Sequence, residues 1–249
     1  MTSLAKKLDE PERLLPERTV RALRRRLRAW GRAHRRQFAW RSEPDPWLTL
    51  VAEFLLQRTR AVQVEPVFEQ FRAAYPTAAA LVVAGPDAAQ RVTARLGIHW
   101  RGPLLYELAG AVAKNHGRPP ESMPELRRLT GIGPYTAAAW LSLHRGKRAV
   151  LVDSNISRWL SRLTGRRYHR DPRHVAWINE LAGQLTPARA HADYNYAVLD
   201  FTMTVCVPGR PRCGECPIRP YCAYGTHHAD LPSRTLASSP SAGSTPRPR

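Results

Sequence analysis

The sequence contains few lysines and few acidic residues. Only four of its 39 basic residues are lysines, Lys6, Lys7, Lys114 and Lys147, and the acidic residues number 20. The net charge of +19 indicates a polyanionic partner, and nucleic acid is the first candidate. The scarcity of lysine also limits the chemistry, because an amine nucleophile has few positions from which to act.

Long apolar runs are missing as well. No stretch approaches the roughly 18 apolar residues that indicate a membrane-spanning helix. Charges interrupt the first apolar segment, so no signal peptide is recognised. We therefore expect a protein without membrane contacts that acts in the cytoplasm.

Alternating patterns typical of strands, and internal repeats, are not found either. Apolar residues recur instead at helical spacing, as in Trp47, Leu50, Val51, Phe54 and Leu55. Such patterns cover 19–30, 47–55, 62–74, 87–95, 103–115, 156–163, 173–185 and 193–205. The sequence predicts an all-α protein.

Two glycines one residue apart interrupt the helical pattern in the segment LTGIGPYTA. Gly131 and Gly133 allow positive φ and a close approach of other atoms, and Pro134 suits the first turn of the following helix. Two short helices joined in this way present backbone N–H groups beside a helix N-terminus, which is a phosphate-binding arrangement. An ordinary corner between helices has the same local pattern, so the residues alone leave both interpretations open.

The cysteines are few and lie close together, at Cys206, Cys213, Cys216 and Cys222. Secreted proteins spread their disulfides through the chain, whereas clustered thiols in a cytosolic protein indicate metal or cluster ligands. Four thiolates suit a [4Fe-4S] cluster or a zinc ion. Most zinc sites join two C-x2-C pairs, and this C-x6-C-x2-C-x5-C pattern has one, so the spacing favours the cluster.

Together, the hairpin LTGIGPYTA, the segment VDSN and the cysteine pattern resemble the helix-hairpin-helix DNA glycosylase superfamily. The match is to its iron–sulfur branch, with endonuclease III and the adenine and thymine mismatch glycosylases, and it covers Leu23 to Tyr224. It implies two helical domains, a six-helix barrel domain and a [4Fe-4S] cluster domain built from both chain ends. Double-stranded DNA would bind in the cleft between them. A monomer associated with the nucleoid is expected.

The resemblance also implies a division of the chain. The expected parts are a disordered extension at 1–18, a helix of the cluster domain at 19–46, the six-helix domain at 47–160, the cluster domain at 161–226 and a disordered tail at 227–249.

The resemblance assigns catalytic roles to Asp153 and Tyr135. Asp153 matches the catalytic aspartate, whose carboxylate stabilises an oxocarbenium-like sugar and directs the attacking water. Taken without the resemblance, it is better explained as an ordinary helix N-cap. Asn155 is expected to hold Asp153 or a phosphate. Tyr135 stands where bifunctional relatives carry a Schiff-base lysine, so the resemblance implies a monofunctional enzyme that leaves an abasic site.

Further residues match the base pocket and the DNA contacts. Glu53 in VAEFLLQRT matches a base-contacting glutamate with a catalytic role, and Gln57 shares its helical face. Arg58 matches the position that fills the stack after the base leaves it, and Ile98 or His99 is expected to act as a wedge from the other side. The hairpin contacts to DNA are expected from Gly131, Ile132 and Gly133, and the cluster ligands are Cys206, Cys213, Cys216 and Cys222.

The expected activity is removal of thymine or uracil opposite guanine. An adenine glycosylase acting opposite guanine or 8-oxoguanine is the alternative. It is disfavoured because that branch has serine where Tyr135 stands, and because too few residues follow Cys222 for its usual C-terminal domain. A DNA-binding protein that kept the fold and lost catalysis is a third hypothesis, which the presence of Asp153 and Glu53 disfavours.

Overall fold

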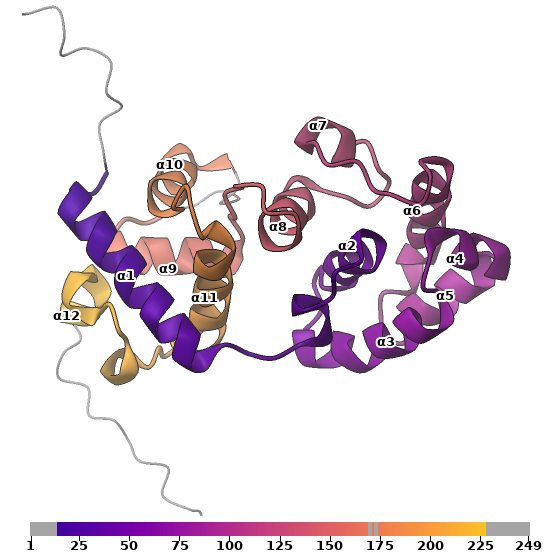
Figure 1. Cartoon of the computed structure of the whole chain (residues 1–249). Coiled ribbons are helices and arrows are strands. Elements are labelled where there is room, and N and C mark those ends of the chain that lie inside the picture. The colour runs from indigo at the N-terminus through magenta and orange to yellow at the C-terminus, as the bar shows by residue number, and fades with distance from the viewer. Residues whose placement is uncertain (1–13, 169–170, 172–173, 228–249) are drawn as a thin grey trace, which may run out of the picture.

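The computed structural model describes residues 14–168, 171 and 174–227, and this part of the chain forms helices and no strands. The first 13 residues of the predicted extension and residues 228–249 of the predicted tail lie outside the described residues. The helices gather in two lobes, as Figure 1 shows. The all-α prediction is confirmed.

One lobe, on the right of Figure 1, consists of the helices from α2 to α8. They are α2 (Pro46–Leu55), α3 (Ala61–Ala74), α4 (Ala78–Ala84), α5 (Pro86–Ala94), α6 (Gly102–Lys114), α7 (Met123–Leu126) and α8 (Pro134–His144), with the 3-10 helix η2 (His99–Arg101). Six of these α-helices have seven residues or more, and α7 is a single turn. The six-helix barrel domain that the resemblance implies corresponds to the longer ones.

The other lobe combines the two ends of the described chain. Its helices are α1 (Glu17–His34), α9 (Ser154–Thr164), α10 (Ala176–Leu185), α11 (His191–Thr204) and α12 (Ala223–His227), with η4 (Cys213–Glu215) and η5 (Arg219–Tyr221). Helix α1 packs along α11, and α9 contacts α10, α11 and α12. The expected boundary at residue 160 falls within α9, and these contacts place the change of lobe before Ser154.

Helix α1 begins earlier than expected. The extension was expected to reach residue 18, but the helix starts at Glu17. The preceding Leu15 is fixed by Gln184, which donates Nε2–H to the Leu15 carbonyl at 2.7 Å and accepts the Leu15 N–H at 3.2 Å. The last residues of the predicted extension therefore belong to the folded lobe.

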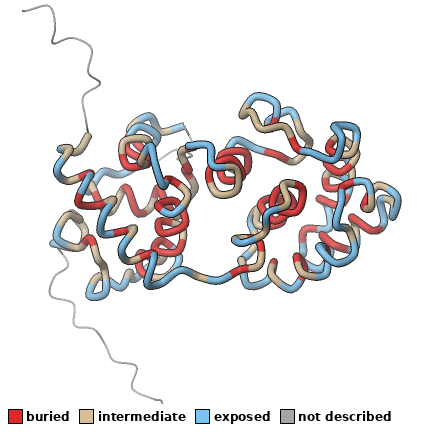
Figure 2. The backbone as a smooth tube through the Cα atoms, viewed as in Figure 1, coloured by how far each residue is buried: buried red, intermediate tan, exposed pale blue. Residues whose placement is uncertain are grey.

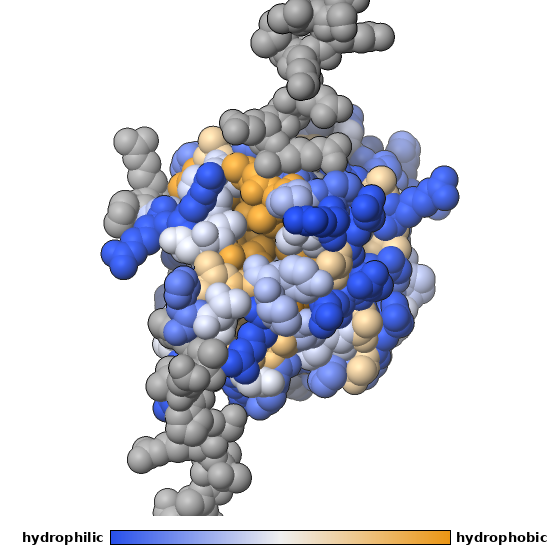
Figure 3. Space-filling model, turned by 90° about the vertical axis from the view of Figure 1, so that its left-hand side faces the viewer, coloured by the Kyte–Doolittle hydropathy of each residue, from blue (hydrophilic) through white to orange (hydrophobic). Residues whose placement is uncertain are grey.

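The outer face of α1 carries the positive charge that the composition predicts. Arg21, Arg25, Arg26 and Arg32 are exposed, while Leu23 is fully buried. Figure 3 looks onto this end of the molecule and shows hydrophilic side chains over much of it. None of the described helices has the length and apolar character needed to cross a membrane.

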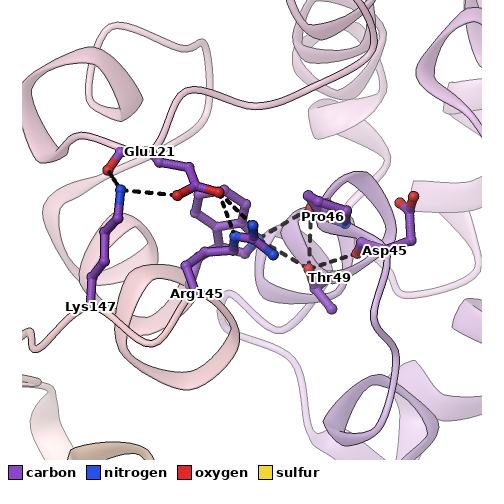
Figure 4. Close-up of polar contacts among 7 residues, drawn as sticks. Asp45, Pro46, Thr49, Glu121, Arg145 and Lys147 are labelled. Carbon is purple, nitrogen blue, oxygen red and sulfur yellow. Dashed lines mark hydrogen bonds and ion pairs between the residues drawn. The ribbon is translucent and has the colours of Figure 1, made fainter.

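The two lobes meet through α8, which packs against both α2 and α11. Its residues from Thr136 to Ser142 are all buried, and Figure 2 shows α8 and α2 as largely buried helices in the middle of the molecule. Trp140 donates Nε1–H to the Pro46 carbonyl at 3.2 Å and to Thr49 Oγ1 at 3.1 Å (Figure 4). This junction fixes the relative position of α8 and α2, which carry the site residues described next.

Candidate active site

The glycine hairpin joins α7 to α8 and depends on Gly131 for two reasons. Gly131 has φ of 77°, and a Cβ there would lie 2.5 Å from Cε2 of Phe54. Gly133 has an ordinary φ of −83°, and a Cβ added there would meet no atom within 4 Å. Positive φ, expected for these glycines, is therefore required at Gly131 and not at Gly133.

The N-terminus of α8 is left open to a ligand. Gly133 is the N-cap and Pro134 opens the helix, and no side chain caps its first N–H groups. Ile132 is buried and anchors the hairpin, and its N–H donates to the Leu129 carbonyl at 3.1 Å, so its predicted contact with DNA is not apparent in this structure. Gln57 also supports the hairpin, because its Nε2–H donates to the Gly131 carbonyl at 2.9 Å. The geometry suits a phosphate, which stays a prediction.

Asp153 is the N-cap of α9, and both its carboxylate oxygens have donors. Oδ1 accepts the Ile156 N–H at 2.7 Å, and Oδ2 accepts from Asn155 Nδ2 at 3.1 Å. These two hydrogen bonds fix the orientation of the carboxylate. The N-cap interpretation of Asp153 is therefore confirmed, and it is compatible with the catalytic role, which stays a prediction.

Asn155 is in turn held by Arg158, a residue that the sequence analysis missed. Arg158 Nη1 donates to Asn155 Oδ1 at 3.0 Å, and Nη2 donates to the carbonyls of Thr202 and Cys206 at 2.9 and 3.0 Å. One guanidinium thus connects the Asp153–Asn155 pair to the loop that begins at Cys206. Its position three residues after Asn155, on the same face of a helix, was the signal in the sequence.

Tyr135 is near enough to the two carboxylates that the sequence singles out for their charges to act on its phenol. Burial raises the pKa of its phenol well above 10, and the negative charges of Asp153 and Glu53 raise it further. The phenol therefore stays protonated and acts as a neutral hydrogen-bond donor, although part of the residue is exposed. The structure thus brings together Tyr135, Asp153 and Glu53, which come from α8, α9 and α2.

Glu53 is buried in the middle of α2 and has a histidine partner. His144 Nε2 lies 2.9 Å from Glu53 Oε1, and the two side chains are 3 and 7% exposed. His144 is the last residue of α8. The sequence analysis missed it, because nothing local shows that the end of α8 faces the middle of α2.

The residues predicted to enter the base stack lie in two loops. Arg58 follows the end of α2, and Ile98 and His99 precede α6. Arg58 is exposed and has φ of 61°, a conformation rare for a residue with a side chain. His99 is exposed, but Ile98 is buried and 8% exposed, so of the two wedge candidates only His99 is available. Ile98 packs inward because its N–H donates to the Thr93 carbonyl and continues the end of α5.

Trp100 is the prominent side chain of this loop, and the sequence analysis passed over it. It is 54% exposed, and the guanidinium of Arg101 lies 4.7 Å from its ring centroid. Arg101 is buried and donates to the Gln57 carbonyl at 3.2 Å, which ties the loop to the turn after α2. The tryptophan in the segment GIHWRG, a loop already expected to contact DNA, was the available signal.

All four cysteines are free and line one cavity together with Trp159 of α9 and Phe201 of α11. Within the described residues, no three His, Cys, Asp or Glu side chains come close enough for one shared metal ion. A [4Fe-4S] cluster is larger than a single ion, so its ligands stand farther apart. The four thiols line one cavity and so fit a group that they would share, and the identity of that group stays a prediction.

Three of the thiols lie in surroundings that disfavour their charged form. Burial raises the pKa of Cys216 to about 12 and also raises the pKa values of Cys213 and Cys222. A metal cluster reverses this effect, since a coordinated thiol loses its proton. Arg162 donates to Cys206 Sγ at 3.5 Å, in line with a site that is to carry negative sulfur.

Comparisons with known proteins give consistent relatives. No family model matches the chain. The chain is 37% identical over 213 residues to a thymine-DNA glycosylase of Aeropyrum pernix, covering 82% of this chain and 95% of that one. It is 32% identical to a thymine/uracil-DNA glycosylase of Methanothermobacter thermautotrophicus, covering 76% and 87%. An adenine DNA glycosylase of Mycobacterium tuberculosis is also 32% identical, covering 88% and 73%.

Solved structures agree with these sequence relatives. A thermostable thymine-DNA glycosylase superposes with a TM-score of 0.78 and 29% identity, covering 84% of this chain and 98% of that one. A trapped covalent intermediate of endonuclease III with DNA superposes with a TM-score of 0.74, covering 87% and 100%. Its 19% identity supports the likeness of fold alone.

Proposed function

The chain belongs to the helix-hairpin-helix DNA glycosylase superfamily, and from this premise we propose that it hydrolyses thymine or uracil from double-stranded DNA at mismatches with guanine. The observation that carries the proposal is the group of Tyr135, Asp153 and Glu53, with a phenol where a lyase would need an amine. The thymine and thymine/uracil glycosylases among the relatives support the same substrate. In this role the protein leaves an abasic site.

The chemistry follows from the two carboxylates. The flipped nucleotide enters the space beside Tyr135, and the C–N bond breaks as positive charge develops on the sugar. Asp153, ionised and held by Ile156 and Asn155, stabilises that charge and directs the water whose hydroxyl adds to C1′. The electron pair of the broken bond leaves with the base, which takes up the proton released by the water. Tyr135 packs against the base and holds it out of the duplex.

The hydrolytic outcome is supported by where the lysines lie. Lys147 donates to the Glu121 carbonyl at 2.7 Å and pairs with its carboxylate at 2.9 Å, and Lys114 ends α6. Lys6 and Lys7 lie outside the described residues. A Schiff base with the sugar needs an amine at the site. We therefore assign hydrolysis alone.

We assign the [4Fe-4S] cluster to Cys206, Cys213, Cys216 and Cys222, on the cavity that they share. A cluster in that position supplies cohesion to the loop rather than a step of hydrolysis. Arg162 contributes by donating to the Val207 and Gly209 carbonyls at 2.7 and 3.0 Å. The loop is thereby fastened to α9, the helix that carries Asp153.

The N-terminus of α8 and the exposed loop residues are assigned to DNA binding. The open N-terminus of α8 is assigned to a backbone phosphate, and Arg58, His99 and Trp100 are assigned to the stack around the vacated position. The surplus of arginine supplies the sequence-independent part of the affinity.

Adenine removal is the second candidate, because the mycobacterial adenine glycosylase is as similar as one of the pyrimidine enzymes. Protonation of a purine requires Glu53 to act as an acid. Tyr135 favours a pyrimidine instead, because the resemblance gives the adenine branch a serine at this position.

A panel of duplexes tests the proposal. The purified protein is incubated with T:G, U:G, A:G, A:8-oxoguanine and fully paired duplexes, and each sample is divided and treated with or without alkali. We expect strand cleavage of T:G and U:G after alkali alone, and no adduct on borohydride treatment. Cleavage without alkali, a trapped adduct, or excision confined to the adenine duplexes would overturn it.

A further inference from the structure

Two phenols of α11 are buried without a hydrogen-bond partner. Tyr194 and Tyr196 are 2 and 5% exposed, and within the described residues neither hydroxyl meets a donor or an acceptor. A buried hydroxyl that makes no hydrogen bond is unfavourable, and such groups are uncommon in folded proteins. A ligand that supplies the missing partner is one explanation for a hydroxyl of this kind.

The two phenols have different neighbours. Helix α1 packs along α11, and the charge that acts on the phenol of Tyr194 is that of Arg24 from α1. The ring of Tyr196 instead meets the ring of His144 from α8 edge-on, with 6.5 Å between centroids. His144 in turn contacts Glu53 at 2.9 Å. Tyr196 therefore borders the candidate site, whereas Tyr194 lies toward α1.

The hydroxyl of Tyr196 lies on the side of Glu53. The guanidinium groups of Arg35 and Arg41 lie 4.9 and 4.6 Å from the centroid of its ring. Burial raises the pKa of the phenol, and the charge of Glu53 raises it further, with a larger effect than either guanidinium has in lowering it. Because the effect of a charge falls with distance, the hydroxyl end of the ring is turned toward Glu53.

This hydroxyl is available as a donor. Its raised pKa keeps the phenol protonated at neutral pH, and a protonated phenol donates one hydrogen bond. The charge of Glu53 acts on Tyr196 of α11 and also on Tyr135 of α8. A base that contacts Glu53 therefore comes near both phenols, of which Tyr135 is already assigned to packing against it.

We propose that Tyr196 is a specificity-determining residue, which donates its hydroxyl hydrogen to a carbonyl oxygen of the flipped pyrimidine. This inference rests on the proposed function and deepens it. Thymine and uracil carry a carbonyl on each side of their ring N–H, so a base that meets Glu53 through that N–H turns a carbonyl toward a neighbouring donor. Adenine carries an amino group on its pairing edge, which is itself a donor. A fixed donor at Tyr196 therefore favours the pyrimidine.

The first test compares Tyr196→Phe with a matched control, Tyr194→Phe. Each substitution removes one buried hydroxyl from α11 and keeps the ring. Single-turnover excision is measured on duplexes with uracil, 4-thiouracil or 2-thiouracil opposite guanine, because sulfur is a weaker acceptor than oxygen. In Y196F we expect excision of uracil to fall by about 10-fold, the effect of one lost hydrogen bond to the base.

The two thio bases identify the oxygen that Tyr196 contacts. When sulfur replaces that oxygen, wild type and Y196F should excise the base at similar rates, because the hydrogen bond is weak in both. On the other thio base the full difference between the two proteins should remain. Y194F should match wild type on all three bases. A wild-type rate in Y196F, an equal fall in Y194F, or the same fall of Y196F on all three bases would overturn the inference.

Two further measurements need no excision. Because the hydroxyl of Tyr196 has no partner in the described part of the protein, its removal should leave the melting temperature at or above that of wild type. A lower melting temperature in Y196F would show that the hydroxyl serves the fold and would contradict the inference. Binding is measured by fluorescence anisotropy on a U:G duplex whose deoxyuridine carries 2′-fluorine, which resists excision.

On this duplex we expect weaker binding by Y196F and wild-type binding by Y194F. An unchanged dissociation constant in Y196F would contradict the contact with the base. Absence of excision from every duplex by wild type would instead contradict the proposed function, so the two failures are distinguishable.

Discussion

The two carboxylates of the site belong to the same chemical class but are held in different ways. Asp153 stands at the start of α9, where a backbone N–H and the Asn155 amide occupy its oxygens. Glu53 stands inside α2, buried, against a histidine from another helix. When two titratable groups of one site have different surroundings, their roles differ accordingly. The orientation of Asp153 is fixed by its own helix, whereas that of Glu53 depends on a residue of another helix.

The first prediction removes the charge of Asp153. Asp153→Asn should lower the excision rate on the order of 10³-fold, because the developing charge on the sugar loses its counterion. Asparagine is as good an N-cap as aspartate, so the stability of α9 should be kept. Single-turnover excision, DNA binding by gel shift and thermal melting measure the three properties. Loss of binding together with excision would show that Asp153 acts through the fold.

The second prediction concerns the support of Asp153. Arg158→Ala removes the donor that holds Asn155 and the Cys206 carbonyl, and we expect excision to fall by about 10- to 100-fold, as for other supporting residues of a site. Arg162→Ala is the matched control, because it removes contacts to the same loop without touching Asn155. Equal losses in the two variants would indicate that the loop, and not the Asn155 contact, matters.

The sequence predicted the N-cap geometry of Asp153 because its motif is local. The segment VDSN puts the carboxylate, the supporting asparagine and the helix start within a few residues, so the N-cap geometry follows from the pattern. The glycine hairpin is local in the same sense. Its positive φ at Gly131 was expected, while the contact with Phe54 that also excludes a side chain was not.

The surroundings of Glu53 could not be predicted from the sequence, because they depend on contacts between segments far apart in the chain. His144 and Tyr196 come from α8 and α11, and the pairing depends on how three helices pack. Helical periodicity shows which face of a helix is apolar, but not which residue of another helix it meets. The same limit explains Ile98, which turns inward, and Trp100, which is exposed beside it.

The third prediction tests the mouth of the site at Trp100. Trp100→Ala should weaken binding to mismatched duplex by about 1–3 kcal/mol, the value of one aromatic–base stack. Val83, 88% exposed on α4 of the same lobe, provides the control, and Val83→Ala should leave binding unchanged. Fluorescence anisotropy gives both dissociation constants. If the Trp100 variant binds with wild-type affinity, Trp100 does not stack on the DNA and His99 remains as the wedge candidate.

The fourth prediction has the smallest expected effect and concerns Glu121, an exposed carboxylate outside the site. Hydrogen bonds from Lys147 and then Arg145 lower the pKa of Glu121 below its ordinary value of 4.5, and Figure 4 shows these three side chains meeting where α8 ends. A lowered pKa means that the stabilisation is present above the unfolded value and is lost as the pH falls through the folded one. Because the group is exposed and screened, Glu121→Gln should cost about 0.2–1 kcal/mol at neutral pH. Urea unfolding at neutral and acid pH measures it, with the difference between variant and wild type vanishing in acid. A stability difference between variant and wild type that persists in acid would mean that Glu121 stabilises the loop without its charge, and it would contradict this prediction.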